Sequence, residues 1–190
     1  MITNKEIASI WGGLRVTPYE DKNIDPLLPL LQVEFSNWSL KKIQSYMNLV
    51  IGETNDVSGI LVARNEALYN VGIAIYTFHK IGAQFLDLEK IQDKKDDKVY
   101  NVLALENIIA SSPILERVVF MALVQGAIKV AEYFDSDYLE LPSISNNKSF
   151  EFVRKKYESY IENADNFRTY IRINNNASKD NFNKKIQLNS

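Results

Sequence analysis

The sequence contains no cysteine and a single histidine, His79. The lack of cysteine excludes disulfide bonds, a thiolate nucleophile and any metal site built on thiolate ligands. One imidazole cannot form a site that needs several histidines, so we expect no bound metal.

An excess of positive charge is also lacking. The chain has 22 Lys and Arg residues against 24 Asp and Glu residues, and no basic stripe is visible, so we expect no nucleic-acid partner. No apolar run reaches the roughly 18 residues that would span a bilayer. Residues 1–6 lack the hydrophobic core of a signal peptide. We therefore expect a cytoplasmic protein that contacts no membrane.

A strand, a helix and a second strand are predicted over residues 99–144. Ser112-Pro113 is typical of a helix start, because a serine hydroxyl can cap free amides and proline fits the first turn. Apolar and small residues recur at helical spacing over 113–134, and 138–144 reads as a strand. The two strands of such a unit are parallel neighbours. A ligand is expected at the carboxyl end of the first strand, beside the helix N-terminus.

The remaining chain predicts further strands and helices of one α+β domain, residues 1–190. We expect helices at 5–11, 25–38, 40–50 and 149–161, a strand at 14–17, an antiparallel hairpin at 57–79 and a strand at 167–173. Residues 174–190 are polar and rich in Asn. They form either a C-terminal extension or a final hairpin strand, held by the domain or by the second subunit of a homodimer.

Several positions within residues 13–173 follow the pattern of a known family. They are the apolar Leu105, Ile108 and Ala110, then Pro113, and later Leu139-x-Leu141. Together with the order of elements, this pattern resembles the GNAT (GCN5-related) N-acetyltransferase family. The resemblance implies a mostly antiparallel central sheet with one parallel pair, formed by the family's fourth and fifth strands, and flanking helices. It also implies acetyl-CoA as a substrate and transfer of its acetyl group to an amine.

The cofactor loop of that family is altered here. The family pattern Gln/Arg-x-x-Gly-x-Gly/Ala falls on Leu115, Val118 and Phe120. Glycines let a pyrophosphate reach bare backbone amides, and larger side chains obstruct that approach. The hydroxyls and free amides at the helix start remain available, with Arg117 as a nearby cation. The candidate acetyl-CoA contacts are Ile108, Ala110, Ser111, Ser112, Ile114, Leu115, Arg117 and Asn146.

Two residues are candidates for catalysis. Glu106 stands among apolar strand residues, where a partly desolvated carboxylate can act as a general base; otherwise it is simply an outward-facing strand residue. In that family a tyrosine often protonates the departing thiolate. This tyrosine would fall at Val153, and Tyr157, one helical turn later, is the nearest substitute for it. Glu140 and His79 could line the same cleft. The simpler interpretations are that Glu140 is a solvated residue at a sheet edge and that His79 is an exposed residue at a strand end.

Two functions remain open at this point. The first is an acyl-CoA-dependent N-acetyltransferase that acts on a small-molecule or peptide amine. The second is a non-catalytic GNAT-like binding or assembly module that has lost acetyl-CoA binding. The altered cofactor loop favours the second function, while the resemblance as a whole favours the first.

Overall fold

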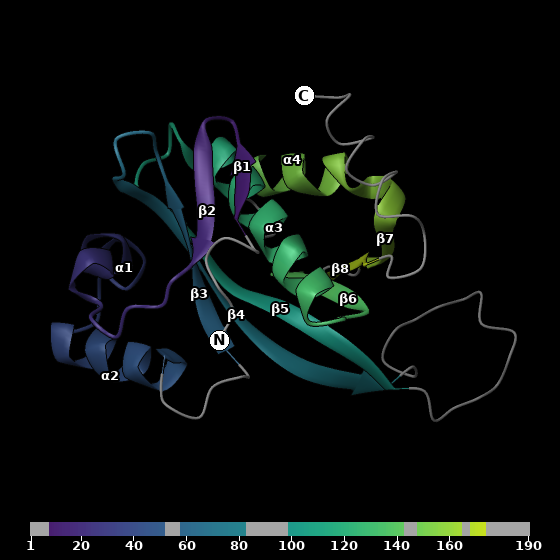
Figure 1. The fold of residues 1–190 in the computed structure, drawn as a ribbon, viewed down its shortest axis with the longest axis horizontal. Helices are drawn as coiled ribbons and strands as arrows, with labels where there is room; N and C mark the ends of the chain where they lie inside the picture. The colour runs from purple at the N-terminus through teal and green to yellow at the C-terminus, as the bar shows by residue number, and fades with distance from the viewer. Residues whose placement is uncertain (1–7, 52–57, 83–98, 143–147, 165–167, 174–190) are drawn as a thin grey trace, which may run out of the picture.

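The computed structural model describes residues 8–51, 58–82, 99–142, 148–164 and 168–173. Its strands form one eight-stranded sheet in the order β1-β2-β3-β4-β5-β6-β8-β7 (Figure 1). The strands are β1 (Ser9–Trp11), β2 (Leu14–Pro18), β3 (Ser58–Arg64), β4 (Asn70–Gly82), β5 (Val99–Ala110), β6 (Tyr138–Pro142), β7 (Ile161–Ala164) and β8 (Arg168–Arg172). The helices are η1 (Asp25–Leu27), α1 (Leu28–Glu34), α2 (Leu40–Ile51), α3 (Glu116–Tyr133), α4 (Lys148–Lys156) and η3 (Glu158–Tyr160).

The predicted strand–helix–strand unit is confirmed. β5 and β6 are parallel, with Val102 opposite Tyr138 and Ala104 opposite Glu140, and α3 connects them. The other strand pairs between described residues are antiparallel, including the predicted hairpin of β3 and β4. The sheet is thus mostly antiparallel with one parallel pair and flanking helices, as the fold class predicted.

The helix predicted over residues 5–11 is wrong in its described part. Ser9–Trp11 instead pairs antiparallel with β2, with Ile10 opposite Arg15. The reason lies in Gly12 and Gly13, which both adopt positive φ angles, 54° and 76°. Two such glycines form the tight turn of a hairpin, a signal in the sequence that outweighs the short helical pattern before it.

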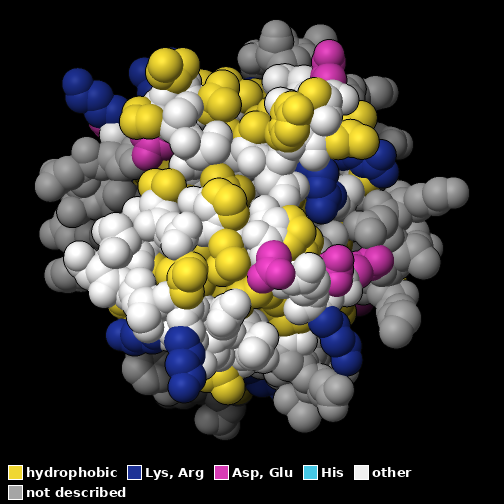
Figure 2. All heavy atoms as spheres, turned by 90° about the vertical axis from the view of Figure 1, so that its left-hand side faces the viewer, with side chains coloured by type: hydrophobic (Ala, Val, Ile, Leu, Met, Phe, Trp, Pro, Cys, Tyr) yellow, Lys and Arg dark blue, Asp and Glu magenta, His cyan; other side chains and the backbone are white. Residues whose placement is uncertain are grey.

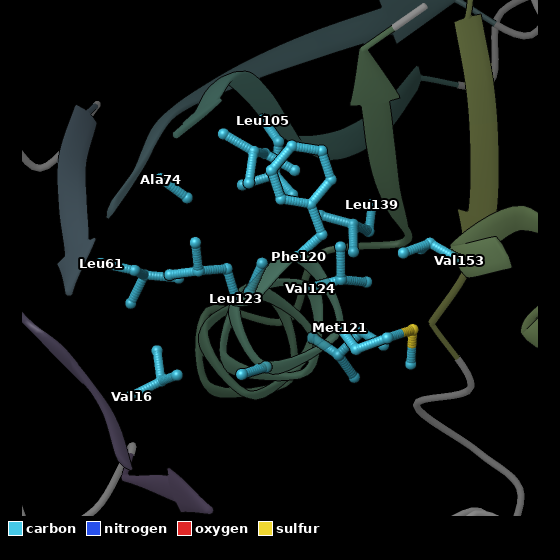
Figure 3. Packing of buried hydrophobic residues seen from close by; sticks show 14 of the residues in the cluster. Val16, Leu61, Ala74, Leu105, Phe120, Met121, Leu123, Val124, Leu139 and Val153 are labelled. Atoms are coloured by element: carbon cyan, nitrogen blue, oxygen red, sulfur yellow. The ribbon is translucent and has the colours of Figure 1, made fainter. Parts of the chain in front are cut away.

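The helix α3 packs closely against the sheet and forms the larger core with it. Figure 3 shows the helix viewed end-on, with apolar side chains from the sheet around it. Glycine makes this approach possible at two places. A Cβ on Gly72 would lie 2.1 Å from Val119 Cγ1, and a Cβ on Gly126 would lie 2.5 Å from Val16 Cγ1.

The helices α1 and α2 cover the opposite face of the sheet. Their buried Leu31, Ile43 and Met47 pack against Ile73 and Ile75 in a second core. Figure 2 views the molecule from this side and shows hydrophobic side chains in several small groups, with charges of both signs between them. Within the described residues, no helix has both the length and the apolar character needed to cross a membrane.

The contact between Gly72 and Val119 leads to a stability prediction. Gly72→Ala places a methyl group against Val119 and near the carbonyl oxygen of Ile109, at 3.0 Å. We expect the free energy of unfolding in urea to fall by about 1–3 kcal/mol, as overpacking usually costs. Val119→Ala removes the side chain that the new methyl group would meet. The double variant should therefore be more stable than the sum of the two single effects predicts. Strict additivity would contradict the close approach.

Candidate functional site

The strands β5 and β6 separate partway along their length. Their pairing ends at Ala104 and Glu140, whereas β5 continues to Ala110. Near the same point the register between β4 and β5 shifts: Tyr76 lies opposite Leu105, and Ile75 opposite Asn107. Glu106 is therefore the extra residue of a β-bulge. A bulge bends its strand and redirects a side chain, which is why bulges recur beside functional sites.

The Glu106 carboxylate is exposed and held from β4. Thr77 Oγ1 donates a hydrogen bond of 2.8 Å to Glu106 Oε1. Tyr46 of α2 also lies within its electrostatic reach: burial raises the pKa of Tyr46, and the charge of Glu106 raises that pKa further. The carboxylate thus stands where α2, β4 and β5 meet, at the separation of β5 from β6.

A second carboxylate on this face is buried. The Glu140 side chain is 7% exposed, and the Arg168 guanidinium donates through Nη1 to its Oε1. The other oxygen, Oε2, lies 3.4 Å from Nε2 of His79, whose side chain is 36% exposed. The interpretation of Glu140 as a solvated residue is wrong, because β8 and β7 extend the sheet beyond β6.

Sequence reasoning considered Glu140 and His79 separately and missed their pairing. The signal that could have revealed it is the parallel register, because Thr77, Ala104, Glu140 and Tyr170 form one cross-strand row. Side chains in such a row share a face of the sheet. Ala104 is small, so the groups on either side of it can approach each other.

The start of α3 differs from the prediction. Pro113 lies in a turn rather than in the helix: the Leu115 amide donates to the Ser112 carbonyl, at 3.2 Å, and the Glu116 amide to the Pro113 carbonyl, at 3.4 Å. Leu115 is the N-cap residue and no side chain caps it, so the predicted Ser112 cap is absent. The Leu115 amide, expected to be free, is thereby occupied.

Other groups at this end of α3 remain available. The Arg117 and Val118 amides precede the first i→i−4 hydrogen bond, from Val119 to Leu115, and neither bonds to a described residue. The Ser111 side chain is exposed and that of Ser112 half-buried, while Ile114 is 91% exposed. The Arg117 guanidinium stacks on the Phe152 ring of α4, 3.4 Å from its centroid. Asn146 lies outside the described residues.

The side chains that replace the family's glycines are packed inside. Phe120 is 2% exposed; in Figure 3 it rises from α3 toward Leu105 of β5, with Leu139 of β6 beside it. Val118 is half-buried and borders Gly12. In β5, Ile108 is buried in the same core and Ala110 is partly buried against it. The α3 side of the separation between β5 and β6 is therefore filled with hydrocarbon.

Tyr157 lies in this core as well. Its side chain is fully buried after the end of α4, and its hydroxyl has no hydrogen-bond partner among the described residues. Burial raises the pKa of Tyr157; Gln125 faces the hydroxyl and opposes that rise, although no hydrogen bond of standard geometry joins them. The structure places Tyr157 on the α3 side of the sheet and Glu106 on the α2 side.

No group of three or more potential metal ligands among His, Cys, Asp and Glu occurs in the described residues. The chemistry available here is that of carboxylates, one imidazole and hydroxyls, arranged on the α2 face beside a split in the sheet.

Comparison with known proteins defines the fold. No family model and no curated protein matches the sequence. Among solved structures, a probable GNAT-family acetyltransferase from Chromobacterium violaceum matches with a TM-score of 0.56 at 12% identity, covering 90% of this chain and 93% of that chain. The chain has the GNAT fold.

Two further structures with this fold carry informative ligands. AAC(6')-Iy, in complex with the bisubstrate analog CoA-S-monomethyl-acetylneamine, matches with a TM-score of 0.55 at 12% identity, covering 75% of this chain and 88% of that chain. AtaT, complexed with acetyl-methionyl-tRNAfMet, also has a TM-score of 0.55 at 12% identity, covering 92% of this chain and 98% of that chain. At such low identity the likeness concerns the GNAT fold alone.

The buried hydroxyl of Tyr157 gives a prediction about stability. Tyr157→Phe removes an unpaired polar group, so we expect the free energy of unfolding at neutral pH to stay level or rise. Because the pKa of Tyr157 is raised in the folded state, the unfolded chain ionises first above pH 10, and stability falls there as pH rises. In urea titrations at several pH values, the variant should lose less stability above pH 10 than the wild-type chain. A large loss at neutral pH would mean that the hydroxyl makes a hydrogen bond.

Proposed function

We propose that the chain is an acyl-CoA-dependent N-acetyltransferase whose amine acceptor enters from the α2 side. Acetyl-CoA would lie where β5 separates from β6, with its phosphates at the start of α3. The GNAT fold supports this proposal, since the matched structures include acetyltransferases and one holds a CoA bisubstrate analog. Residues 1–190 would act as one domain.

The position of Glu106 is the main support for the proposal. An exposed carboxylate, fixed by Thr77 at a bulge beside the split, can attract a cationic amine and accept a proton from it. The amine nitrogen attacks the thioester carbonyl carbon, so that the N–C bond forms and the C–S bond breaks. A proton then passes from the nitrogen through Glu106 to the departing thiolate. Holding the two reactants together supplies much of the remaining rate enhancement.

Acetyl-CoA would bind to groups other than those that the family's cofactor loop provides. The Arg117 and Val118 amides lie at the end of α3 where anions are favoured, and Ser111 and Ser112 precede that end in the chain. Each such contact is worth about 0.3–1 kcal/mol, so they cannot hold CoA alone. The backbone of β5 beyond Ala104, which β6 leaves unpaired, would supply strand-like hydrogen bonds to the pantetheine chain.

One observation favours a second candidate function, a non-catalytic binding or assembly module. Phe120 occupies the α3 side of the split between Leu105 and Leu139, and Leu115 replaces the basic or amide residue of the loop. A chain that had abandoned acetyl-CoA would gain stability from such packing.

Thiol release from acetyl-CoA in the presence of neamine tests the proposal. Glu106→Gln keeps the hydrogen bond from Thr77 but removes the proton acceptor, so we expect kcat to fall about 100-fold. Glu66→Gln, an exposed carboxylate in the β3–β4 turn, is the control and should keep wild-type activity. An undiminished kcat in Glu106→Gln would refute the assigned base. Absence of thiol release from the wild-type chain would favour the non-catalytic module.

A further inference from the structure

Glu140, His79 and Arg168 come from three strands and form one cluster on the α2 face. Arg168 binds Oε1 of the buried carboxylate. Oε2 has no hydrogen bond of standard geometry from the described residues and lies 3.4 Å from His79 Nε2. An ionised carboxylate only accepts hydrogen bonds, so it favours the imidazole tautomer with its proton on Nε2. This leaves the lone pair on Nδ1 available, and no described residue bonds to it.

The cluster lies next to Glu106. His79 and Thr77 occupy the same face of β4, two residues apart, which corresponds to about 7 Å along a strand. Thr77 holds Glu106, and the residue opposite Thr77 is Ala104, which in turn lies opposite Glu140. His79 is 36% exposed, so its ring is open to solvent on the face that also carries Glu106.

Acyl transfer to a primary amine needs two proton removals from the nitrogen. Near neutral pH the acceptor is an ammonium ion and loses one proton before it can attack; the attacking nitrogen then loses a second. One group cannot hold both protons at once, and Glu106 takes the second, so the first needs another proton acceptor on the same face.

We propose that His79, oriented by Glu140, is the base that removes a proton from the ammonium group of the substrate. This proton removal produces the nucleophilic amine. The ammonium N–H bond breaks, its proton moves to His79 Nδ1, and the half-exposed ring releases it to solvent. The second proton leaves through Glu106 to the thiolate, so the products are the amide, the free thiol and one proton. Glu140 stabilises the imidazolium as a carboxylate does in a catalytic triad, and the contact with Arg168 holds that carboxylate in place. This inference rests on the proposed acetyltransferase activity.

The test uses residues 1–190 with acetyl-CoA as donor and neamine as the amine, measured by thiol release; water alone, which has no ammonium group, gives the background rate of hydrolysis. We expect His79→Ala to lower kcat about 100-fold without changing the KM for acetyl-CoA, and added imidazole to restore turnover in that variant only. Glu140→Gln, a positioning variant, should lower kcat about tenfold. Lys80→Gln, the exposed neighbour of His79 on β4, should keep wild-type kcat. His79→Asn replaces His79→Ala if thermal melting shows that the alanine variant is unfolded.

The outcomes separate this inference from the proposed function. Wild-type turnover that survives His79→Ala, or a loss that imidazole does not restore, overturns the role of His79 and leaves the acetyltransferase proposal intact. A wild-type chain that releases thiol no faster with neamine than with water alone overturns both. Restoration by imidazole cannot arise from a merely structural histidine, so it supports the proton-acceptor role directly.

Discussion

The close approach of α3 to the sheet is the contact on which the rest of the structure depends. Gly72 and Gly126 admit Val119 and Val16 at distances that no Cβ would allow. With the helix seated there, the chain must cross over the sheet from β5 to β6, which makes that pair parallel. The parallel pairing is short, and β5 runs past it. The sheet is therefore split beyond Ala104, and α3 packs on one side of it.

The two faces of the sheet then differ in character. On the α3 side, Phe120 and Tyr157 are buried in hydrocarbon, and even the tyrosine hydroxyl lacks a partner among the described residues. On the α2 side, Glu106, Glu140 and His79 place ionisable groups along neighbouring strands. Burial raises the pKa of Tyr76 to about 12 and so keeps this α3-side phenol neutral. The groups that we propose to move protons therefore lie on the α2 face.

The sequence predicts the individual helices and strands well. It predicts poorly which side chains from different strands lie together. Helical spacing over 113–134 and the apolar strand before it identify the crossover unit, because both patterns are local. Glu106 was found as an isolated carboxylate in an apolar strand, but the bulge that exposes it depends on the register with β4. The cluster of His79, Glu140 and Arg168 depends on the pairing of three strands with a fourth between them. No local pattern encodes such an arrangement.

Calorimetric titration of acetyl-CoA into the wild-type protein tests the central claim most directly. We expect binding in the micromolar range, about −8 kcal/mol, because strand-like pairing to β5 adds to the contacts at the start of α3. Binding of this strength would show that a GNAT fold can hold its donor with Val118 and Phe120 in place of glycines. No heat of binding at millimolar acetyl-CoA would contradict the account and identify the chain as a GNAT fold that no longer uses this donor.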